Sequence, residues 1–244
     1  PVKTVDYDQE SLTIDYTNEA IKFIKADADK PFFLYLPYSM PHLPISTTSD
    51  FKGKSEGGLY GDVIETIDWS VGEVMKTLKD LGLDDNTLII FSSDNGPWHE
   101  LPNRMLQKGV ESWHQGTAGP LHGSKASTYE GGMRVPGIFY WKGQIPSGQV
   151  SSNIATTMDI FPTLLEITGT SAPKGKEFDG LNILSFLKGK TDSPRTEFYF
   201  FRGRTLEAVR EGDWKLRYSN ERKPGVDRDD PVTIELFNTK DDAG

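Results

Sequence analysis

The strongest structural signal in this sequence of 244 residues is an apolar stripe at helical spacing between residues 60 and 81. The stripe consists of Val63, Ile67, Val71, Val74, Leu78 and Leu81, with Gly82 at the position of a left-handed helix cap. Short apolar runs of strand length, 32–36 and 87–92, stand on either side. A strand, a crossover helix and a second strand form a βαβ unit, the building block of a parallel sheet. The sequence therefore predicts an α/β protein.

Three further segments continue this pattern. Apolar residues at helical spacing predict a helix over 15–26, which ends before Pro31 because proline interrupts helical hydrogen bonding. A strand is expected at 133–141. A second helix is expected at 158–168, where Pro162 falls in the first turn and is tolerated. We assign these segments to one large domain that extends to residue 190.

The pattern changes after residues 189–194. Short strand-like runs at hairpin spacing follow, and they predict a small antiparallel sheet. These runs are 197–201, 208–210, 214–218 and 234–237. The expected organisation is a large α/β domain over residues 1–190 and a small antiparallel subdomain over 191–244.

Charge and cysteine content exclude several classes of protein. The chain has 36 acidic and 27 basic residues, a net charge of -9, which is the opposite of what a nucleic-acid-binding surface requires. No apolar run approaches the roughly 20 residues of a transmembrane helix. The sequence has no cysteine, which excludes disulfides, thiolate zinc sites and a cysteine nucleophile within it. A start at Pro1 is what a fragment without its natural beginning would show.

Asp94 and Asn95 are the first candidate ligands, because they directly follow the predicted strand 87–92. In open α/β sheets, ligands bind beyond the carboxyl ends of the strands. The two side chains offer oxygen atoms, which suit Ca²⁺ or Mg²⁺ better than zinc. By itself, an Asp-Asn-Gly triplet is more typical of a turn.

His42 and Lys125 are the other candidates. His42 lies in a proline-bounded loop after 32–36, where it could donate a hydrogen bond to an anion or act as an acid. Lys125 could direct its ammonium group at a tetrahedral anion. In isolation, each is more typical of a solvated surface residue. The remaining histidines have no zinc-site spacing and are interpreted as loop residues; they are His99, His114 and His122.

The order of these short motifs is more specific than any one of them. They are PHLP at 41–44, YGD at 60–62, SSDNG at 92–96, 119–125 with Lys125, TYEGGMRVP at 128–136 and TTMDIFPTL at 156–164. Later segments are DG at 179–180, AVR at 208–210, WKL at 214–216 and ELFN at 235–238. As a set, and over most of the chain, they closely resemble the arylsulfatase family, the type I sulfatases.

This resemblance implies an alkaline-phosphatase-like fold, with a large mixed sheet between helices and a small antiparallel subdomain. It implies hydrolysis of sulfate esters by a formylglycine nucleophile, made from the first residue of a Cys/Ser-x-Pro-x-Arg motif, with a Ca²⁺ ion that neutralises the sulfate oxygens. Asp94 and Asn95 match the metal ligands, and His42 and Lys125 match the catalytic residues that bind the sulfate and the leaving oxygen. We expect all four to face one pocket.

The sequence departs from the family in one respect. It has neither a cysteine nor a Ser-x-Pro-x-Arg motif, since Ser193-Pro194-Arg195 has the wrong spacing. We therefore expect the nucleophile and the remaining metal ligands to lie in an amino-terminal portion that this chain lacks. The implied partners are that portion and a small-molecule or glycan sulfate ester. The family resemblance implies a secreted, periplasmic or lysosomal location.

Two alternatives remain open. A phosphatase or phosphodiesterase of the same superfamily would use two zinc ions and a histidine directly after the aspartate. Here that position is Asn95, whose amide oxygen is a poor zinc ligand. The second alternative is a catalytically inactive binding module on the same fold, and fold alone does not separate it from an enzyme.

Overall fold

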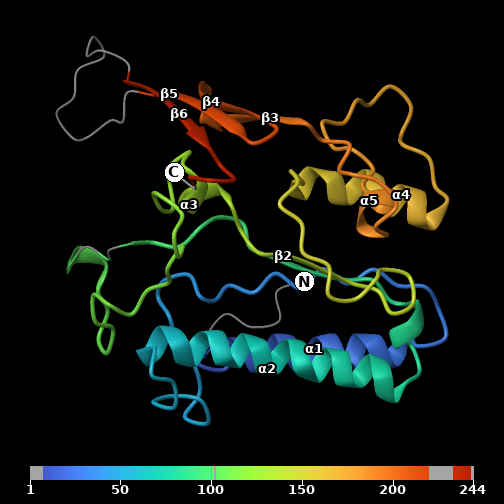
Figure 1. Ribbon diagram of the computed structural model, residues 1–244. Coiled ribbons are helices and arrows are strands. Elements are labelled where there is room, and N and C mark those ends of the chain that lie inside the picture. The colour runs from blue at the N-terminus through green and yellow to red at the C-terminus, as the bar shows by residue number, and fades with distance from the viewer. Residues whose placement is uncertain (1–7, 100, 102, 220–232, 243–244) are drawn as a thin grey trace. The chain divides into compact units, whose positions relative to one another are not determined.

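The computed structural model describes residues 8–99, 101, 103–219 and 233–242. The chain forms two compact units. The first comprises Pro1–Thr87 and Trp98–Thr117, and the second comprises Leu88–Pro97 and Ala118–Gly244. The elements of both are labelled in Figure 1.

The first unit is built on two packed helices, α1 (Leu12–Ala26) and α2 (Gly58–Asp80), which lie side by side in Figure 1. Their buried apolar residues include Ala20, Ile24, Val63, Ile67 and Leu78. A buried hydrogen bond of 2.5 Å joins the hydroxyls of Thr17 and Ser70 across the contact. Both predicted helices are therefore confirmed. Two short 3-10 helices, η1 (Asp84–Asn86) and η2 (Asn103–Met105), complete the unit.

The predicted βαβ unit is wrong. Residues 32–36 form no strand and pair with no segment in the part of the chain that the structure describes. The side chains of Phe33 and Tyr35 are 72% and 76% exposed. An apolar run has strand character only where a neighbour takes up its backbone hydrogen bonds, and the run itself does not identify that neighbour.

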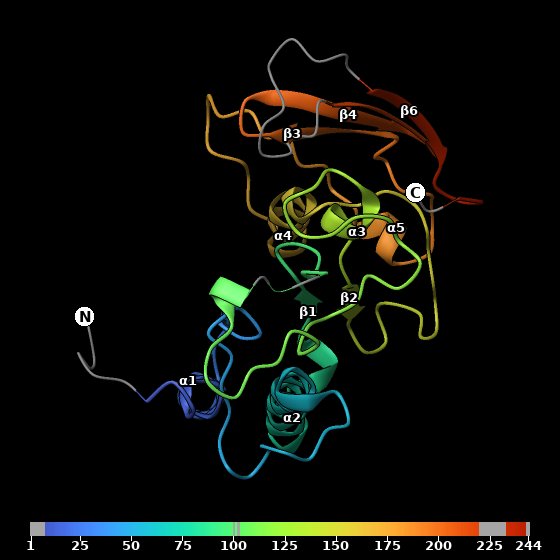
Figure 2. The ribbon, with the colours of Figure 1, turned by 90° about the vertical axis from the view of Figure 1, so that its left-hand side faces the viewer.

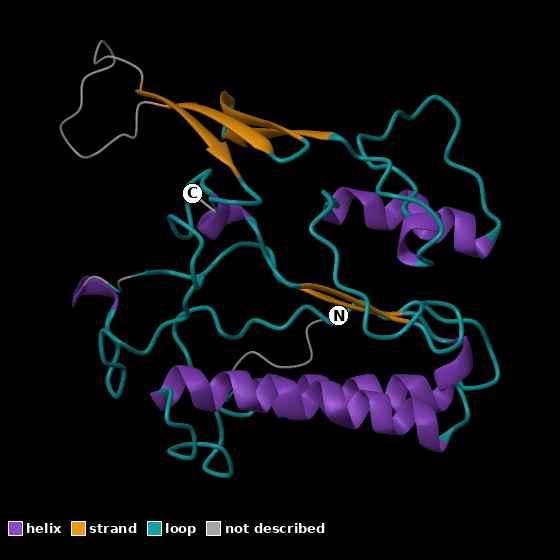
Figure 3. Cartoon of the chain, viewed as in Figure 1, coloured by secondary structure: helices purple, strands orange, loops and turns teal. Residues whose placement is uncertain are grey.

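The second predicted strand does form, with a different partner and in the opposite sense. β1 (Ile89–Ser92) pairs antiparallel with β2 (Gly137–Tyr140), so that Ser92 lies opposite Gly137. Figure 3 shows this pair as a short ribbon. The predicted strand over 133–141 is thus confirmed in its second half, and its first residue instead belongs to the short helix α3 (Glu130–Met133).

Downstream, helix α4 (Ile160–Thr168) confirms the prediction for 158–168. It follows the 3-10 turn η3 (Thr157–Asp159), whose capping box joins Thr156 and Asp159. Gly169 ends the helix in the left-handed conformation with a φ of 64°. A one-turn helix, α5 (Leu184–Leu187), follows.

The predicted antiparallel sheet is confirmed. It has four strands in sequential order, β3 (Glu197–Arg202), β4 (Thr205–Glu211), β5 (Trp214–Ser219) and β6 (Thr233–Asn238), which Figure 2 shows together. The domain boundary near residue 190 stays a prediction.

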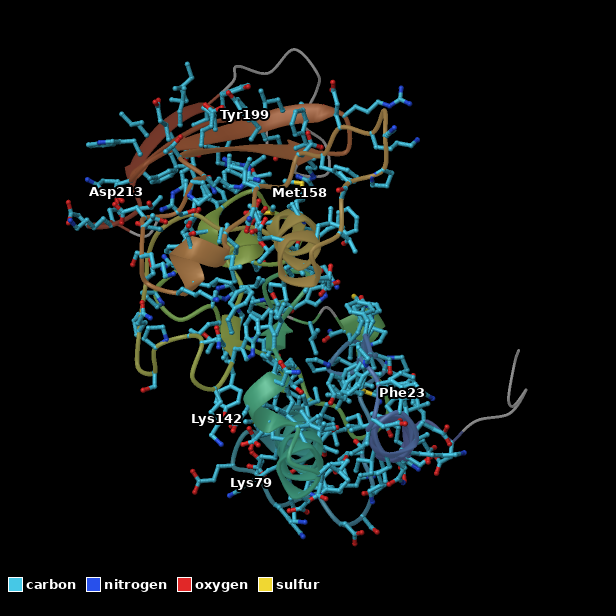
Figure 4. All side chains as sticks on the ribbon, turned by 90° about the vertical axis from the view of Figure 1, so that its right-hand side faces the viewer. Phe23, Lys79, Lys142, Met158, Tyr199 and Asp213 are labelled. Atoms are coloured by element: carbon cyan, nitrogen blue, oxygen red, sulfur yellow. The ribbon has the colours of Figure 1, made fainter. Side chains whose placement is uncertain are left out.

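One face of this sheet buries charged side chains together with Phe200 and Ala208, and the other face exposes apolar side chains. On β5, Lys215 and Arg217 are 1% and 2% exposed, whereas the intervening Leu216 is 37% exposed. Other apolar side chains are exposed as well, among them Tyr199 on β3, labelled in Figure 4. The face of the sheet that packs on residues 128–130 therefore carries buried charges.

Within the described residues, none of the helices combines the length and the apolar composition that crossing a lipid bilayer requires.

Candidate active site

The site begins where β1 ends. Ser92 is the last strand residue, and Asp94 and Asn95 follow in a turn. Asp94 is exposed and Asn95 is half-buried. The Asn95 side-chain amide nitrogen donates a 3.0 Å hydrogen bond to the carbonyl oxygen of Gly96. An amide nitrogen only donates, so the amide oxygen is the atom that Asn95 can offer to a cation.

Gly96 is buried against the helix α3. Its amide donates a 3.0 Å hydrogen bond to the carbonyl oxygen of Gly132. A Cβ atom at Gly96 would overlap the carbonyl oxygen of Gly131. The glycine is required here by close approach of two backbones, and Gly96 is not among the described glycines with a positive φ.

Gly131 and Gly132 are also crowded, on the side away from Gly96. A Cβ atom at Gly131 would overlap the carbonyl oxygen of Gly123, and one at Gly132 would overlap that of Ser124. The amide of Gly131 also donates a 2.7 Å hydrogen bond to the carbonyl oxygen of His122. Gly96, Gly131 and Gly132, here called the glycine cluster, thus bring three backbone segments into contact.

Lys125 lies on the third of these segments. Its backbone amide donates a 2.8 Å hydrogen bond to the carbonyl oxygen of Pro97. The side chain is half-buried. Pro97 is two residues beyond Asn95, so this hydrogen bond places the Lys125 loop directly against the segment that carries Asp94 and Asn95. Three of the four predicted site residues therefore lie on backbone segments in mutual contact.

His42 belongs to the first unit, and its grouping with Lys125 stays a prediction. It is exposed and lies between Pro41 and Pro44, both of which follow cis peptide bonds. Its Nδ1 atom is 2.8 Å from the carbonyl oxygen of Leu43. A carbonyl accepts only, so Nδ1 carries a proton, and a second proton would be held at Nε2. The Nε2 atom of the protonated ring is the one suited to donate to an anion.

The other histidines have separate structural surroundings. The Nδ1 atom of buried His114 accepts a 3.1 Å hydrogen bond from the amide of Glu111. The His122 ring packs edge-on against Tyr129, with centroids 4.4 Å apart. Across the described ranges, no group of three or more histidine, cysteine or acidic residues is arranged to hold a metal ion.

Beneath the Lys125 loop lies a buried set of charges that the sequence motifs did not indicate. Lys215 Nζ donates to Glu130 Oε1 at 2.9 Å and to the carbonyl oxygen of Thr128 at 2.6 Å. Burial lowers the pKa of Lys215, and the Glu130 carboxylate opposes this effect. The signal available in the sequence, alternating charged and apolar residues on β5, would assign Lys215 to the solvent side.

Arg217, two residues further along β5, binds the same segment, residues 128–130. Its guanidinium donates at 2.8 Å both to the Tyr129 hydroxyl and to Glu235 Oε2. Tyr129 in turn donates to Glu235 at 2.8 Å. Burial by itself would raise the pKa of Glu235, but the hydrogen bonds from Tyr129 and Arg217 outweigh burial and lower it.

The donor set fits a hard cation in part. One carboxylate and one amide oxygen are ligands that Ca²⁺ accepts. Asp94 and Asn95 would supply only two of the six to eight oxygens that Ca²⁺ typically takes. The residues present are therefore consistent with no more than about a third of the ligands of a calcium site.

Comparisons with known proteins give the family. The sulfatase family model matches residues 3–170. N-acetylgalactosamine-6-sulfatase of Canis lupus familiaris is 39% identical over 211 residues, which are 85% of this chain and 38% of that protein. Human steryl-sulfatase is 39% identical over 202 residues, 82% of this chain and 34% of that protein. The chain thus spans little more than a third of the length of these relatives.

A solved sulfatase structure from Pseudoalteromonas sp. matches 99% of this chain and 50% of its own, with a TM-score of 0.81 and 30% identity. The match confirms the expected fold class, a partial alkaline-phosphatase-like α/β domain with a small antiparallel sheet. Because the family model covers more than half of the sequence, this chain belongs to the sulfatase family.

Proposed function

We propose that this chain is the carboxyl-terminal part of an enzyme that hydrolyses sulfate esters. The observation that carries the proposal is the contact between the Lys125 loop and the segment 94–97 in a chain of the sulfatase family. That contact supports the proposal because it joins the backbone of Lys125 to the segment of Asp94 and Asn95, which directly follows β1. As the bond between sulfur and the ester oxygen breaks, negative charge develops on that departing oxygen and on the sulfuryl oxygens, and preplaced cations and donors stabilise it.

Each predicted residue has a separate role. The Asp94 carboxylate and the Asn95 amide oxygen would hold Ca²⁺, which when bound supplies positive charge at the sulfate oxygens. The Lys125 ammonium would bind a sulfate oxygen and the leaving oxygen. His42, protonated at Nε2, would donate to the departing oxygen as its bond to sulfur breaks.

An amino-terminal segment completes the site in this proposal. The chain covers 38% and 34% of two relatives, and it has no Cys/Ser-x-Pro-x-Arg motif. The formylglycine nucleophile and the remaining metal ligands would therefore come from sequence that precedes residue 1. The relatives' names specify a sugar sulfate in one case and a steryl sulfate in another, so we propose only the general class, a sulfate ester of a glycan or small molecule.

The test uses the full-length polypeptide, expressed with the enzyme that forms formylglycine. We expect hydrolysis of 4-nitrophenyl sulfate, loss of activity in a calcium chelator and recovery on addition of Ca²⁺. Lys125→Ala should lower kcat/KM by roughly 10²-fold or more, comparable to the loss of one preorganised donor. Lys79→Ala is the matched control, because Lys79 is an exposed lysine in the last turn of α2.

Two results would contradict the proposal. One is preferential hydrolysis of 4-nitrophenyl phosphate with zinc, which would favour the phosphatase alternative. The other is Ca²⁺ binding without turnover of any sulfate ester, which would favour an inactive binding module.

A further inference from the structure

Lys215 is a buried cation that the proposed chemistry does not use. Its side chain is 1% exposed, and its ammonium group is surrounded by Glu130 Oε1, the carbonyl oxygen of Thr128 and the ring of Phe200, whose centroid is 3.8 Å away. Such a pair is weak evidence for stability, because desolvation of the two charges offsets much of their attraction. Its directed hydrogen bonds, by contrast, fix the position of the segment that carries the two acceptor oxygens, those of Thr128 and Glu130.

Both acceptors belong to the segment 128–130, and two side chains of β5 bind that segment. Lys215 binds Thr128 and Glu130. Arg217, on the same face of β5, donates through Nε to the Thr128 hydroxyl at 3.3 Å and through Nη1 to the Tyr129 hydroxyl at 2.8 Å. Arg210 on β4 adds a second cation, 3.6 Å from Glu130 Oε2. The sheet therefore fixes residues 128–130 through buried charged groups.

The fixed segment leads directly into the glycine cluster. Glu130 precedes Gly131 and Gly132, and Gly132 accepts the hydrogen bond from the amide of Gly96. On the opposite side, Gly131 donates to His122 at the start of the loop that carries Lys125. Because a Cβ atom has no room at any of the three glycines, a displacement of residues 130–132 must displace both neighbouring segments.

We propose that Lys215 and Glu130 form a positioning pair, which fixes the positions of Asp94, Asn95 and Lys125 through the glycine cluster. The proposal rests on the proposed function, since it assigns the pair a role toward the predicted calcium ligands. Misplacement of reacting groups by about 1 Å can lower turnover by about 10²-fold. Residues that support metal ligands from behind typically change metal affinity or activity by about 10–100-fold when altered.

The experiment uses the full-length enzyme and the variants Lys215→Met, Glu130→Gln and the double variant. Lys215→Met keeps side-chain length and removes the charge. Glu130→Gln keeps the volume and one acceptor, so it tests the pair even if Lys215→Met fails to fold. For each variant we measure Ca²⁺ binding by calorimetry, kcat and KM for 4-nitrophenyl sulfate, the melting temperature and hydrogen exchange at the amide of Gly96.

We expect each single variant to weaken Ca²⁺ binding by roughly 10-fold or more and to lower kcat by about 10–100-fold, with a smaller change in KM. Exchange at the Gly96 amide should accelerate. The double variant should be no worse than the poorer single variant, because both changes break the same contact.

Arg195→Met is the matched control. It breaks another buried ion pair in the same unit, that of Arg195 with Asp159, which has no contact with the glycine cluster in the described structure. It should lower the melting temperature while Ca²⁺ binding and kcat at room temperature stay at the wild-type level.

Normal Ca²⁺ affinity, kcat and Gly96 exchange in folded Glu130→Gln or Lys215→Met would overturn the positioning role and leave the proposed function intact. Effects of Arg195→Met equal to those of Lys215→Met would also overturn it, because they would show a general loss of stability. If the wild-type enzyme itself bound no Ca²⁺ and hydrolysed no sulfate ester, the proposed function would fail and the positioning role with it.

Discussion

At the scale of single residues, glycine has two different uses in this chain. Gly96 lies where a methyl group would overlap the carbonyl oxygen of Gly131, whereas a methyl group at Gly72, exposed in α2, would have no atom within 4 Å. The first position requires the absence of a side chain. At the second, glycine only adds conformational freedom to the unfolded chain and weakens the helix.

Gly96→Ala should therefore lower the free energy of unfolding by about 1–3 kcal/mol, the usual cost of overpacking. Gly72→Ala should raise the free energy of unfolding by about 0.5–1 kcal/mol. Urea denaturation of the two variants and the wild type measures both effects. A neutral Gly96→Ala would show that residues 131–132 can move away from Asp94 and Asn95, contrary to the close packing described above.

His42 permits a prediction about chemistry. A phenolate leaving group needs little protonation, while the alkoxide of a sugar needs much more. His42→Ala in the full-length enzyme should thus reduce kcat/KM less for 4-nitrophenyl sulfate than for a sugar sulfate. Equal losses for the two substrates would limit His42 to binding or electrostatic stabilisation and remove the acid role.

At the scale of elements, the start of α4 depends on one buried carboxylate. Asp159 is fully buried and accepts hydrogen bonds from the amides of Thr156 and Leu181 and from the Arg195 side chain. Burial by itself would raise the pKa of Asp159, but the hydrogen bonds from Arg195, Leu181 and Thr156 outweigh burial and lower it.

A lowered folded-state pKa means that ionised Asp159 stabilises the fold above its unfolded pKa of about 3.9, and that this contribution is lost as pH falls through the folded value. Asp159→Asn should lower the free energy of unfolding at neutral pH by about 3–5 kcal/mol, because it leaves the Arg195 side chain, which is 10% exposed, without its carboxylate. The difference from wild type should shrink below about pH 4. Urea denaturation at neutral pH and on either side of about pH 4 tests this; a difference independent of pH would mean that the charge of Asp159 contributes nothing.

The elements that the sequence predicted correctly are those with local signals. α2 has an apolar stripe over several turns, and α4 has its proline in the first turn and Gly169 as a cap. Strand pairing has a local signal only at hairpin spacing, as in the sheet of β3 to β6. Residues 32–36 look like a strand from composition, but their partner is absent from the described structure, and β1 pairs with a segment far along the chain. Periodicity identifies an element and does not identify its neighbour.

The candidate site was predictable to a similar extent. Asp94 and Asn95 could be identified because they follow an apolar run, and Lys125 because its motif stands in the order of a known family. The buried pair of Glu130 and Lys215 could not be identified from the sequence. A lysine that alternates with apolar residues on a strand is normally on the solvent side, and only the tertiary structure shows that β5 directs Lys215 and Arg217 inward.

At the scale of the whole molecule, the chain of residues 1–244 should not hydrolyse a sulfate ester on its own. It has neither the nucleophile motif nor more than two of the predicted calcium ligands, and Ca²⁺ typically takes six to eight. Its Ca²⁺ affinity should accordingly be far below that of the full-length enzyme. Calorimetry and a 4-nitrophenyl sulfate assay on the purified chain measure both, and turnover by this chain alone would contradict the division of the site between two segments.

The inward-facing charges of the small sheet also limit how such a protein can change over generations. A mutation at Lys215 alone leaves buried Glu130 with only the more distant Arg210, 3.6 Å away, and a mutation at Glu130 alone leaves buried Lys215 without its carboxylate. Simultaneous loss of both residues, or exchange of the whole sheet together with residues 128–130, avoids a variant in which one of the two buried charges has lost the other. Among sulfatases related to this one, positions 130 and 215 should therefore vary as a pair. A small sheet moved from one relative into another should fold correctly only when the residue at position 130 is moved with it.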